Sequence, residues 1–251
     1  MRVALKFAYD GRLFSGFARQ PGRRTVEGDL LTLLGEWGAF SSLDEARFRS
    51  GSRTDRGVSA LGNVVGFSTE MSLEELLRQM PGRIPDLNVY GVRAVDDSFY
   101  PRFADQRWYR YYLRTEGLDL GRVLDVVPVF RGEHDFRNFA KLEPGKDPVR
   151  CIERLDAVEE GRFLVLDFRA QTFLWHQVRR IVAALIRVGQ GKLSREAVAK
   201  ALDDPGHRVD YGLAPAEPLF LQEVMYPFTF EELPHAAAGI AKLEESIIND
   251  L

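Results

Sequence analysis

The 251-residue sequence has little of the material from which metal sites and disulfides are built. It contains one cysteine, Cys151, and only four histidines, which are scattered along the chain. A single cysteine cannot form an internal disulfide, and the histidines lack the spacing of metal ligands. We therefore expect a protein of the reducing cytoplasm that has no structural disulfide and no metal site.

Long hydrophobic runs are also missing. No apolar stretch approaches the roughly 20 residues that span a bilayer, and the sequence begins directly with a strand pattern, so we expect neither a membrane anchor nor a signal peptide. The residues are 45% apolar and 28% charged, which is ordinary for a soluble globular protein. The length allows one large domain or two smaller ones, each with its own core.

Lysine is scarce, with only six among the 34 basic residues, and the other 28 are arginine. Arginine is the planar donor that binds phosphate through two hydrogen bonds. The net charge is −3, but the segment from Glu231 to Leu251 carries −4, so the rest of the chain is +1. This distribution is compatible with a nucleic-acid partner. Thermophily or codon usage that favours arginine would give the same composition.

Periodicity predicts an α+β protein with mainly antiparallel sheets. In the first half, alternation predicts a half-buried strand over residues 3–9, and Thr25 caps a helix whose apolar face ends near Trp37. Ser72 and Glu75 form a capping-box pattern before a helix that Pro81 and Gly82 should end. A strand is expected at residues 88–95.

The second half has a similar pattern of strands and helices, without obvious sequence identity to the first half. Strands are predicted at residues 107–114, 151–158, 163–170 and 219–226. A strongly apolar helix is expected over 178–186, and another should begin at Ser194 and end at Pro205. The tail from Glu231 is amphipathic and should dock on another surface. We place the boundary near Asp105, which gives an N-terminal subdomain 1–104 and a C-terminal subdomain 105–251.

The stretch 50–62 has an unusual composition for a connection between elements. It holds three glycines, one carboxylate and two guanidiniums, contributed by Gly51, Gly57, Gly62, Asp55, Arg53 and Arg56. Glycines allow sharp bends or close approach of another group, so a ligand could reach Asp55. The structural alternative is a turn in which Asp55 caps its own backbone and the arginines are solvated.

The run Arg53-Thr54-Asp55-Arg56-Gly57-Val58-Ser59-Ala60 resembles the active-site motif of the TruA family of tRNA pseudouridine synthases, usually Gly-Arg-Thr-Asp-Ala-Gly-Val-His-Ala. Ser52, Arg56 and Ser59 depart from that motif in the manner of the archaeal branch. Further similar stretches occur in the family's order at residues 9–20, 104–111, 134–139, 173–182 and 217–221, so the resemblance covers nearly the whole chain. Phe17 and Pro218 stand where the family usually has Trp and Gly.

The resemblance implies the pseudouridine synthase fold, with two similar subdomains of mainly antiparallel sheet flanked by helices and an active-site cleft between them. It implies an isomerase that converts uridine to pseudouridine at positions 38–40 of the tRNA anticodon stem-loop, without metal or cofactor. Asp55 would be the nucleophile, Arg179 its cationic partner, and Tyr109 the group that stacks on the uracil and handles the proton of carbon 5. The residues expected to bind substrate are Arg53, Thr54, Leu219, Tyr111, Arg23 and Arg24.

Each assignment has a structural alternative. Arg179 could extend along its stem to solvent, Tyr109 could be an ordinary sheet aromatic, and Leu219 could belong to the core. The arginine-rich loop after residue 10 could be a solvated connection. At the level of function, the alternatives are a non-catalytic RNA-binding protein that retains the fold and a carboxylate hydrolase. A hydrolase would require a second acid/base group, and the loop around Asp55 has no paired carboxylate.

The resemblance also implies assembly and partners. TruA-type enzymes act as homodimers on tRNA, and a chain of this length is short for enclosing a tRNA alone. The amphipathic tail, with Ile240, Leu243 and Ile247, would either pack at the dimer interface or cover its own sheet.

Overall fold

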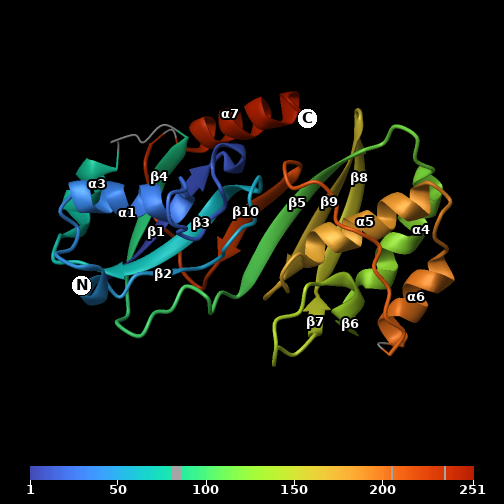
Figure 1. The fold of residues 1–251 in the computed structure, drawn as a ribbon. Coiled ribbons are helices and arrows are strands. Elements are labelled where there is room, and N and C mark those ends of the chain that lie inside the picture. Colours follow the sequence, from blue (N-terminus) through green and yellow to red (C-terminus); the bar gives the residue numbers. More distant parts are fainter. Residues whose placement is uncertain (81–85, 205, 235) are drawn as a thin grey trace. The chain divides into compact units, whose positions relative to one another are not determined.

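The computed structural model describes residues 1–80, 86–204, 206–234 and 236–251 (Figure 1). The chain forms two units: the first contains Met1–Asp105 and Phe220–Leu251, and the second contains Gln106–Leu219. The structure thus groups residues 220–251, which the sequence analysis assigned to the C-terminal subdomain, with the first unit. The reason is strand pairing, because β10 (Leu219–Met225) and β11 (Glu231–Glu232) both pair with strands of the first unit.

The first unit has a mixed sheet in the order β11-β4-β1-β3-β10. Its long strands are β1 (Arg2–Tyr9), β3 (Ser59–Ser68) and β4 (Leu87–Val95), and the short β2 (Arg49–Ser50) pairs with β3. The pairs β1–β3, β1–β4 and β11–β4 are antiparallel, whereas β10 runs parallel to β3.

Strand β1 is buried along its whole length, so the prediction of a half-buried strand was wrong. One face carries the expected apolar residues. The other face carries Lys6, whose Nζ lies 5.5 Å from the centre of the Phe230 ring and forms ion pairs with Glu223 at 2.7 Å and Glu232 at 3.0 Å. These partners come from β10, β11 and the segment between them. Alternation within β1 could not reveal a cover made by residues so distant in the sequence.

Two helices of the first unit, α1 and α3, begin where the sequence predicted. In α1 (Val26–Glu36), Thr25 Oγ1 accepts a hydrogen bond from the Gly28 N–H. In α3 (Leu73–Gln79), Ser72 and Glu75 form the predicted capping box. Pro81 and Gly82, expected to end that helix, lie outside the described residues. The short elements of this unit are η1 (Gly11–Leu13) and α2 (Leu43–Ala46).

The C-terminal tail forms α7 (Ala236–Asn249) and docks on the first unit. Gln222 of β10 donates to Glu244 at 2.6 Å, and Ile247 is fully buried. The expected docking of the amphipathic tail is therefore confirmed, and the surface is one of the chain's own.

The second unit has the antiparallel sheet β5-β9-β8, formed by Gln106–Arg114, Phe163–Ala170 and Arg154–Glu160. The expected strand at 151–158 is divided into β7 (Val149–Ile152) and β8 at Glu153, and β7 pairs with β6 (Gly132–Asp135) in a separate small sheet.

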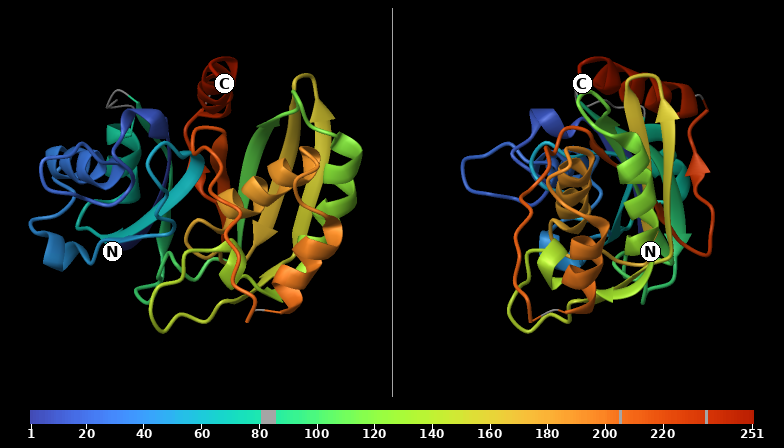
Figure 2. Two further views of the ribbon diagram at one scale, coloured as in Figure 1. Left: turned by 45° about the vertical axis from the view of Figure 1, so that its right-hand side comes forward. Right: turned by 90° about the vertical axis from the view of Figure 1, so that its right-hand side faces the viewer.

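Helices α4 (Leu120–Val126), α5 (Gln177–Gly189) and α6 (Arg195–Asp203) lie together on one face of the larger sheet (Figures 1 and 2). This unit also contains two 3-10 turns, η2 (Val127–Phe130) and η3 (Arg137–Phe139). Pro205, expected to end α6, is outside the described residues. Helices and mostly antiparallel strands confirm the predicted α+β class.

Candidate active site

Asp55 occupies the first position of a tight turn that leads into β3. The Val58 N–H donates to the Asp55 carbonyl at 3.2 Å, and Gly57 has a φ of 86°. A positive φ at the third position is typical of a type II turn and favours glycine. Asp55 is half-buried in this turn, and the neighbouring Arg53 and Arg56 are exposed. The loop therefore holds one carboxylate in a defined position beside two accessible cations.

The residues just before Asp55 are fixed by both neighbouring strands. Thr54 Oγ1 lies 2.8 Å from the hydroxyl of Tyr9 at the end of β1. On the other side, Asn63 of β3 donates through Nδ2 to the Ser52 carbonyl at 3.0 Å. Thr54 is buried, and its carbonyl accepts from the Phe17 N–H at 3.2 Å. Thr54, which the sequence predicted to bind substrate, positions the loop in this structure.

Gly11 allows the first loop to lie directly against the Asp55 turn. A Cβ at Gly11 would be 2.0 Å from the Val58 carbonyl oxygen, a distance no side chain can occupy. The Gly11 N–H donates to Ser59 Oγ at 3.0 Å, which fixes the two segments together. Sequence reasoning did not identify this role, although the Tyr9-Asp10-Gly11 stretch of the family motif contained its signal.

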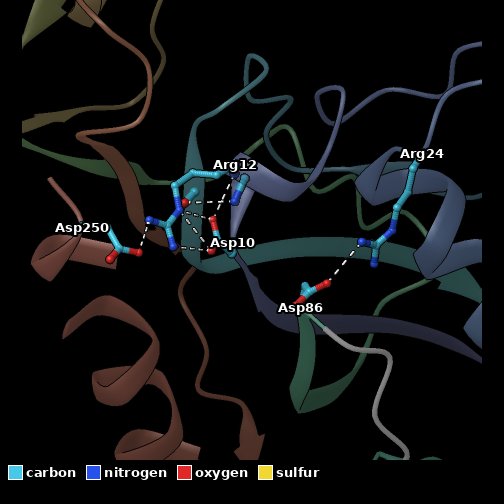
Figure 3. A network of polar contacts seen from close by, with 7 residues as sticks. Asp10, Arg12, Arg24, Asp86 and Asp250 are labelled. Carbon is cyan, nitrogen blue, oxygen red and sulfur yellow. Dashed lines mark hydrogen bonds and ion pairs between the residues drawn. The ribbon is translucent and has the colours of Figure 1, made fainter. Parts of the chain in front are cut away.

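The arginines of the first unit fall into two groups. Arg23, Arg53 and Arg56 are exposed and have no ion pair among the described residues. Arg24, in contrast, pairs with Asp29 at 2.8 Å. It also pairs with Asp86 at 3.2 Å (Figure 3). Of the two arginines expected to bind RNA from this loop, Arg23 is available and Arg24 is held by carboxylates.

Arg12 belongs to the engaged group and connects the two ends of the first unit's sequence. Its guanidinium pairs with Asp10 at 2.8 Å and with Asp250, just beyond α7, at 2.9 Å (Figure 3). The hydrogen bonds that Arg12 donates to these carboxylates, of which those to Asp10 contribute most, raise the pKa of Arg12 above its ordinary value. Arg12 thus ties the tail to the loop that packs on the Asp55 turn.

In the second unit, Arg179 of α5 is held by a segment that follows α6. Its Nε donates to the Ala214 carbonyl at 2.8 Å, and the Ala214 N–H donates to the Arg179 carbonyl at 3.2 Å. Arg179 is half-buried. Arg179 belongs to the second unit and Asp55 to the first, and their pairing stays a prediction.

The aromatic residues of β5 have different surroundings. Tyr109 is half-buried, and the Phe173 ring meets it edge-on with centroids 5.3 Å apart. Tyr111 is only 2% exposed and donates its hydroxyl to the Pro215 carbonyl at 3.2 Å. Burial raises the pKa of Tyr111, and the charge of Arg179 opposes this shift. Leu219 is likewise buried. Tyr109 is therefore the more accessible of the two tyrosines.

The described residues contain no group of three or more histidines, cysteines or acidic side chains that could hold a metal ion. Within the same parts of the chain, no helix is both long and apolar enough to cross a bilayer.

Comparison with known proteins identifies the family. A family model described as tRNA pseudouridine synthase matches residues 127–227. The tRNA pseudouridine synthase A of Thermococcus kodakarensis is 43% identical over 236 residues, which cover 90% of this chain and 85% of that protein. The Pyrococcus furiosus protein of the same name is 37% identical over 252 residues, covering 99% and 91%.

Among solved structures, a chain of a Cbf5-Nop10-Gar1 complex is similar with a TM-score of 0.38 and 12% identity, over 73% of this chain and 45% of that one. The Thermococcus and Pyrococcus relatives are far more similar in sequence, and their matches cover nearly the whole chain. This chain therefore belongs to the TruA family of tRNA pseudouridine synthases, which are isomerases.

Proposed function

We propose that this protein converts uridine to pseudouridine in the anticodon stem-loop of tRNA, at positions 38–40, with Asp55 as the nucleophile. The observation that carries the proposal is the Arg53-Thr54-Asp55 stretch of the family motif on a turn that β1 and β3 fix from both sides. A preorganised carboxylate beside exposed cations suits attack on a nucleotide of a polyanion.

The proposed reaction rearranges one nucleoside and leaves its atomic composition unchanged. Asp55 attacks carbon 1′ of the ribose as the bond from that carbon to nitrogen 1 breaks, and the detached base rotates. Carbon 5 then bonds to carbon 1′ and displaces the Asp55 carboxylate. Carbon 5 loses its proton, and nitrogen 1 acquires one. Tyr109 is assigned to stack on the uracil and to handle the proton of carbon 5, since it is the least buried of the three tyrosines of β5.

Arg179 is assigned as the cationic partner of Asp55. A carboxylate is a nucleophile only when it is ionised, and a guanidinium close to it favours the ionised form. The contact between Arg179 Nε and Ala214 supports this role because it fixes the orientation of the guanidinium plane. Leu219 and Tyr111 would form the apolar wall of the uracil site.

The exposed arginines of the first unit supply the contacts to RNA phosphates in this proposal. Arg23 and Arg53 are assigned to that role, since neither is neutralised by a carboxylate in the described chain. A uridine in a stacked stem must be flipped out before it can react, at a cost of roughly a few kcal/mol that stacking and pocket contacts offset.

The test is mapping of pseudouridine in tRNA transcripts after incubation with Asp55→Asn. The amide preserves the size of the side chain but cannot act as an anionic nucleophile, so we expect normal folding, normal tRNA affinity and no product. Product formation at an appreciable rate would disprove the role of Asp55. A wild-type protein that binds tRNA and forms no pseudouridine would instead favour the non-catalytic RNA-binding alternative.

A second variant separates the nucleophile from its partner. Arg179→Gln should lower kcat on the order of 100-fold while tRNA affinity changes little, as expected for loss of one electrostatic contact at the reacting group. The control is Arg180→Gln, the next residue on α5, whose guanidinium pairs with Asp210 at 3.0 Å. Equal effects of the two substitutions would argue against the assignment of Arg179.

A further inference from the structure

Trp175 is a large aromatic residue placed at the surface of the loop that leads into α5. The residue is 45% exposed, although tryptophan usually contributes to a core or an interface. Neither the motif nor the proposed catalytic roles account for it. An exposed tryptophan in an RNA-modifying enzyme therefore requires an explanation of its own.

The backbone around Trp175 is fixed on both sides. Leu174 and Gln177 exchange two hydrogen bonds, from the Leu174 N–H to Gln177 Oε1 at 2.8 Å and from the Gln177 N–H to the Leu174 carbonyl at 3.1 Å. The Trp175 carbonyl accepts from the Lys141 N–H at 2.8 Å. Trp175 is thus presented by a closed turn, which lowers the entropic cost of binding a ligand.

The next residue adopts an unfavourable conformation that maintains this presentation. His176 has a φ of 65°, in the left-handed region that residues with a Cβ rarely adopt. Its carbonyl accepts from the Arg180 N–H at 2.9 Å, so the left-handed residue directly starts α5. Left-handed conformations of non-glycine residues are found preferentially at functional sites.

Lys141 places a positive charge over the indole ring of Trp175. Its Nζ lies 4.0 Å from the centre of the Trp175 ring, within the range of a cation–π contact. Lys141 is exposed and has no ion pair within the described parts of the chain. An accessible aromatic ring next to an unneutralised cation matches the two parts of a nucleotide, a base that stacks and a phosphate that carries negative charge.

The same loop also contacts the residue assigned to the target uracil. Phe173, two residues before Trp175, packs edge-on against Tyr109. A nucleotide on Trp175 would therefore be bound by the loop that also supports Tyr109.

We propose that Trp175 and Lys141 form a second nucleotide site, in which an unpaired base of the RNA stacks on the indole and its phosphate pairs with Lys141. The occupant is a neighbour of the flipped uridine in the same RNA, so the inference rests on the proposed function. The site contributes affinity and position and takes no part in bond making or breaking.

The test compares Trp175→Ala, Trp175→Phe and wild type for binding of an unmodified tRNA transcript and for turnover. We expect Trp175→Ala to raise the Kd about five- to 150-fold, the range produced by alanine substitution of a stacking aromatic. Trp175→Phe should recover most of the affinity. RNA binding should quench the fluorescence of the wild type more than that of Trp175→Phe, which retains Trp37 and Trp108.

Val158→Ala is the matched control, because Val158 is an exposed apolar residue of the same unit at 55% exposure. It should leave the Kd unchanged. Lys141→Gln should reduce the slope of log Kd against log salt by about 0.7, as for one single-strand phosphate contact.

An unchanged Kd for Trp175→Ala, with equal quenching in wild type and Trp175→Phe, would overturn the proposal even if the wild type forms pseudouridine. A thermal unfolding curve of Trp175→Ala that matches the wild type ensures that a loss of affinity is not a loss of fold. If the wild type forms no pseudouridine yet the stacking signals persist, the proposed function fails and the nucleotide site remains.

Discussion

At the scale of single residues, the glycines differ sharply in the space around them. Gly11 lies against the Val58 carbonyl of the Asp55 turn, whereas a Cβ added at Gly35, in α1, would meet no atom within 4 Å beyond its own stretch of helix. The same substitution to alanine should therefore have opposite consequences at these two positions.

Gly11→Ala should destabilise the protein by about 1–3 kcal/mol, as overpacking does, and should strongly lower the rate of pseudouridine formation because the Asp55 turn must shift. Gly35→Ala should stabilise α1 by about 0.5–1 kcal/mol and leave activity unchanged. Thermal unfolding together with product formation measures both effects. An active and stable Gly11→Ala variant would show that the first loop does not support the turn.

Arg23 and Arg24 are adjacent in sequence but differ in their partners. Arg23→Gln should reduce the slope of log affinity against log salt by about 0.7 to 0.9, because a free guanidinium can neutralise one phosphate. Arg24→Gln should change that slope less, since Asp29 and Asp86 already bind its guanidinium. Filter binding of tRNA at several salt concentrations tests this contrast. A larger effect of Arg24→Gln would mean that RNA displaces its carboxylate partners.

At the scale of elements, Lys6 on β1 and Glu223 on β10 form a largely buried pair. Burial raises the pKa of Glu223, and Lys6 opposes the shift without cancelling it. The folded state then binds protons more tightly than the unfolded state. The contribution of Glu223 to the free energy of unfolding is therefore greatest below the ordinary glutamate pKa of about 4.3. It decreases as the pH rises through the raised pKa of the folded state.

Glu223→Gln should remove this contribution. As the pH rises from about 4.3 to neutrality, the free energy of unfolding should fall less, or rise more, in the variant than in the wild type. Chemical denaturation at several pH values provides the comparison, with Glu231→Gln as the control because Glu231 is an exposed glutamate of the same short strand, β11. Parallel pH profiles for wild type and Glu223→Gln would contradict the raised pKa.

The elements also show which features the sequence could predict. Helix starts were predictable because capping is local: Thr25 and Ser72 bind backbone groups only three residues away. The burial of both faces of β1 was not predictable, because its second cover comes from residues near Phe230.

The same distinction between local and long-range contacts applies to the candidate active site. Asp55 was identified because the motif around it is continuous in sequence. The close approach of Gly11 to Val58 and the engagement of Arg24 by Asp86 depend on contacts between distant segments, so only the structure reveals them.

At the scale of the whole molecule, we predict a homodimer in solution. The argument is that one chain of 28.5 kDa offers a small surface for a tRNA, and a symmetric dimer would double the number of exposed arginines. Light scattering at working concentration should give twice the chain mass. A mass of 28.5 kDa with full activity would contradict this prediction. Because Ile247 of α7 is already buried within its own chain, the dimer interface should not require it.

The return of the chain to its first unit has a consequence for synthesis on the ribosome. Strand β3, which follows the Asp55 turn, receives its partner β10 only after all residues of the second unit have been translated. Domains usually fold in the order in which they emerge, but here the unit that starts first is completed last. A nascent chain that stalls after residue 219 would contain every residue of the second unit and an unfinished sheet around Asp55. Chains terminated there would therefore lack the finished sheet that carries the Asp55 turn.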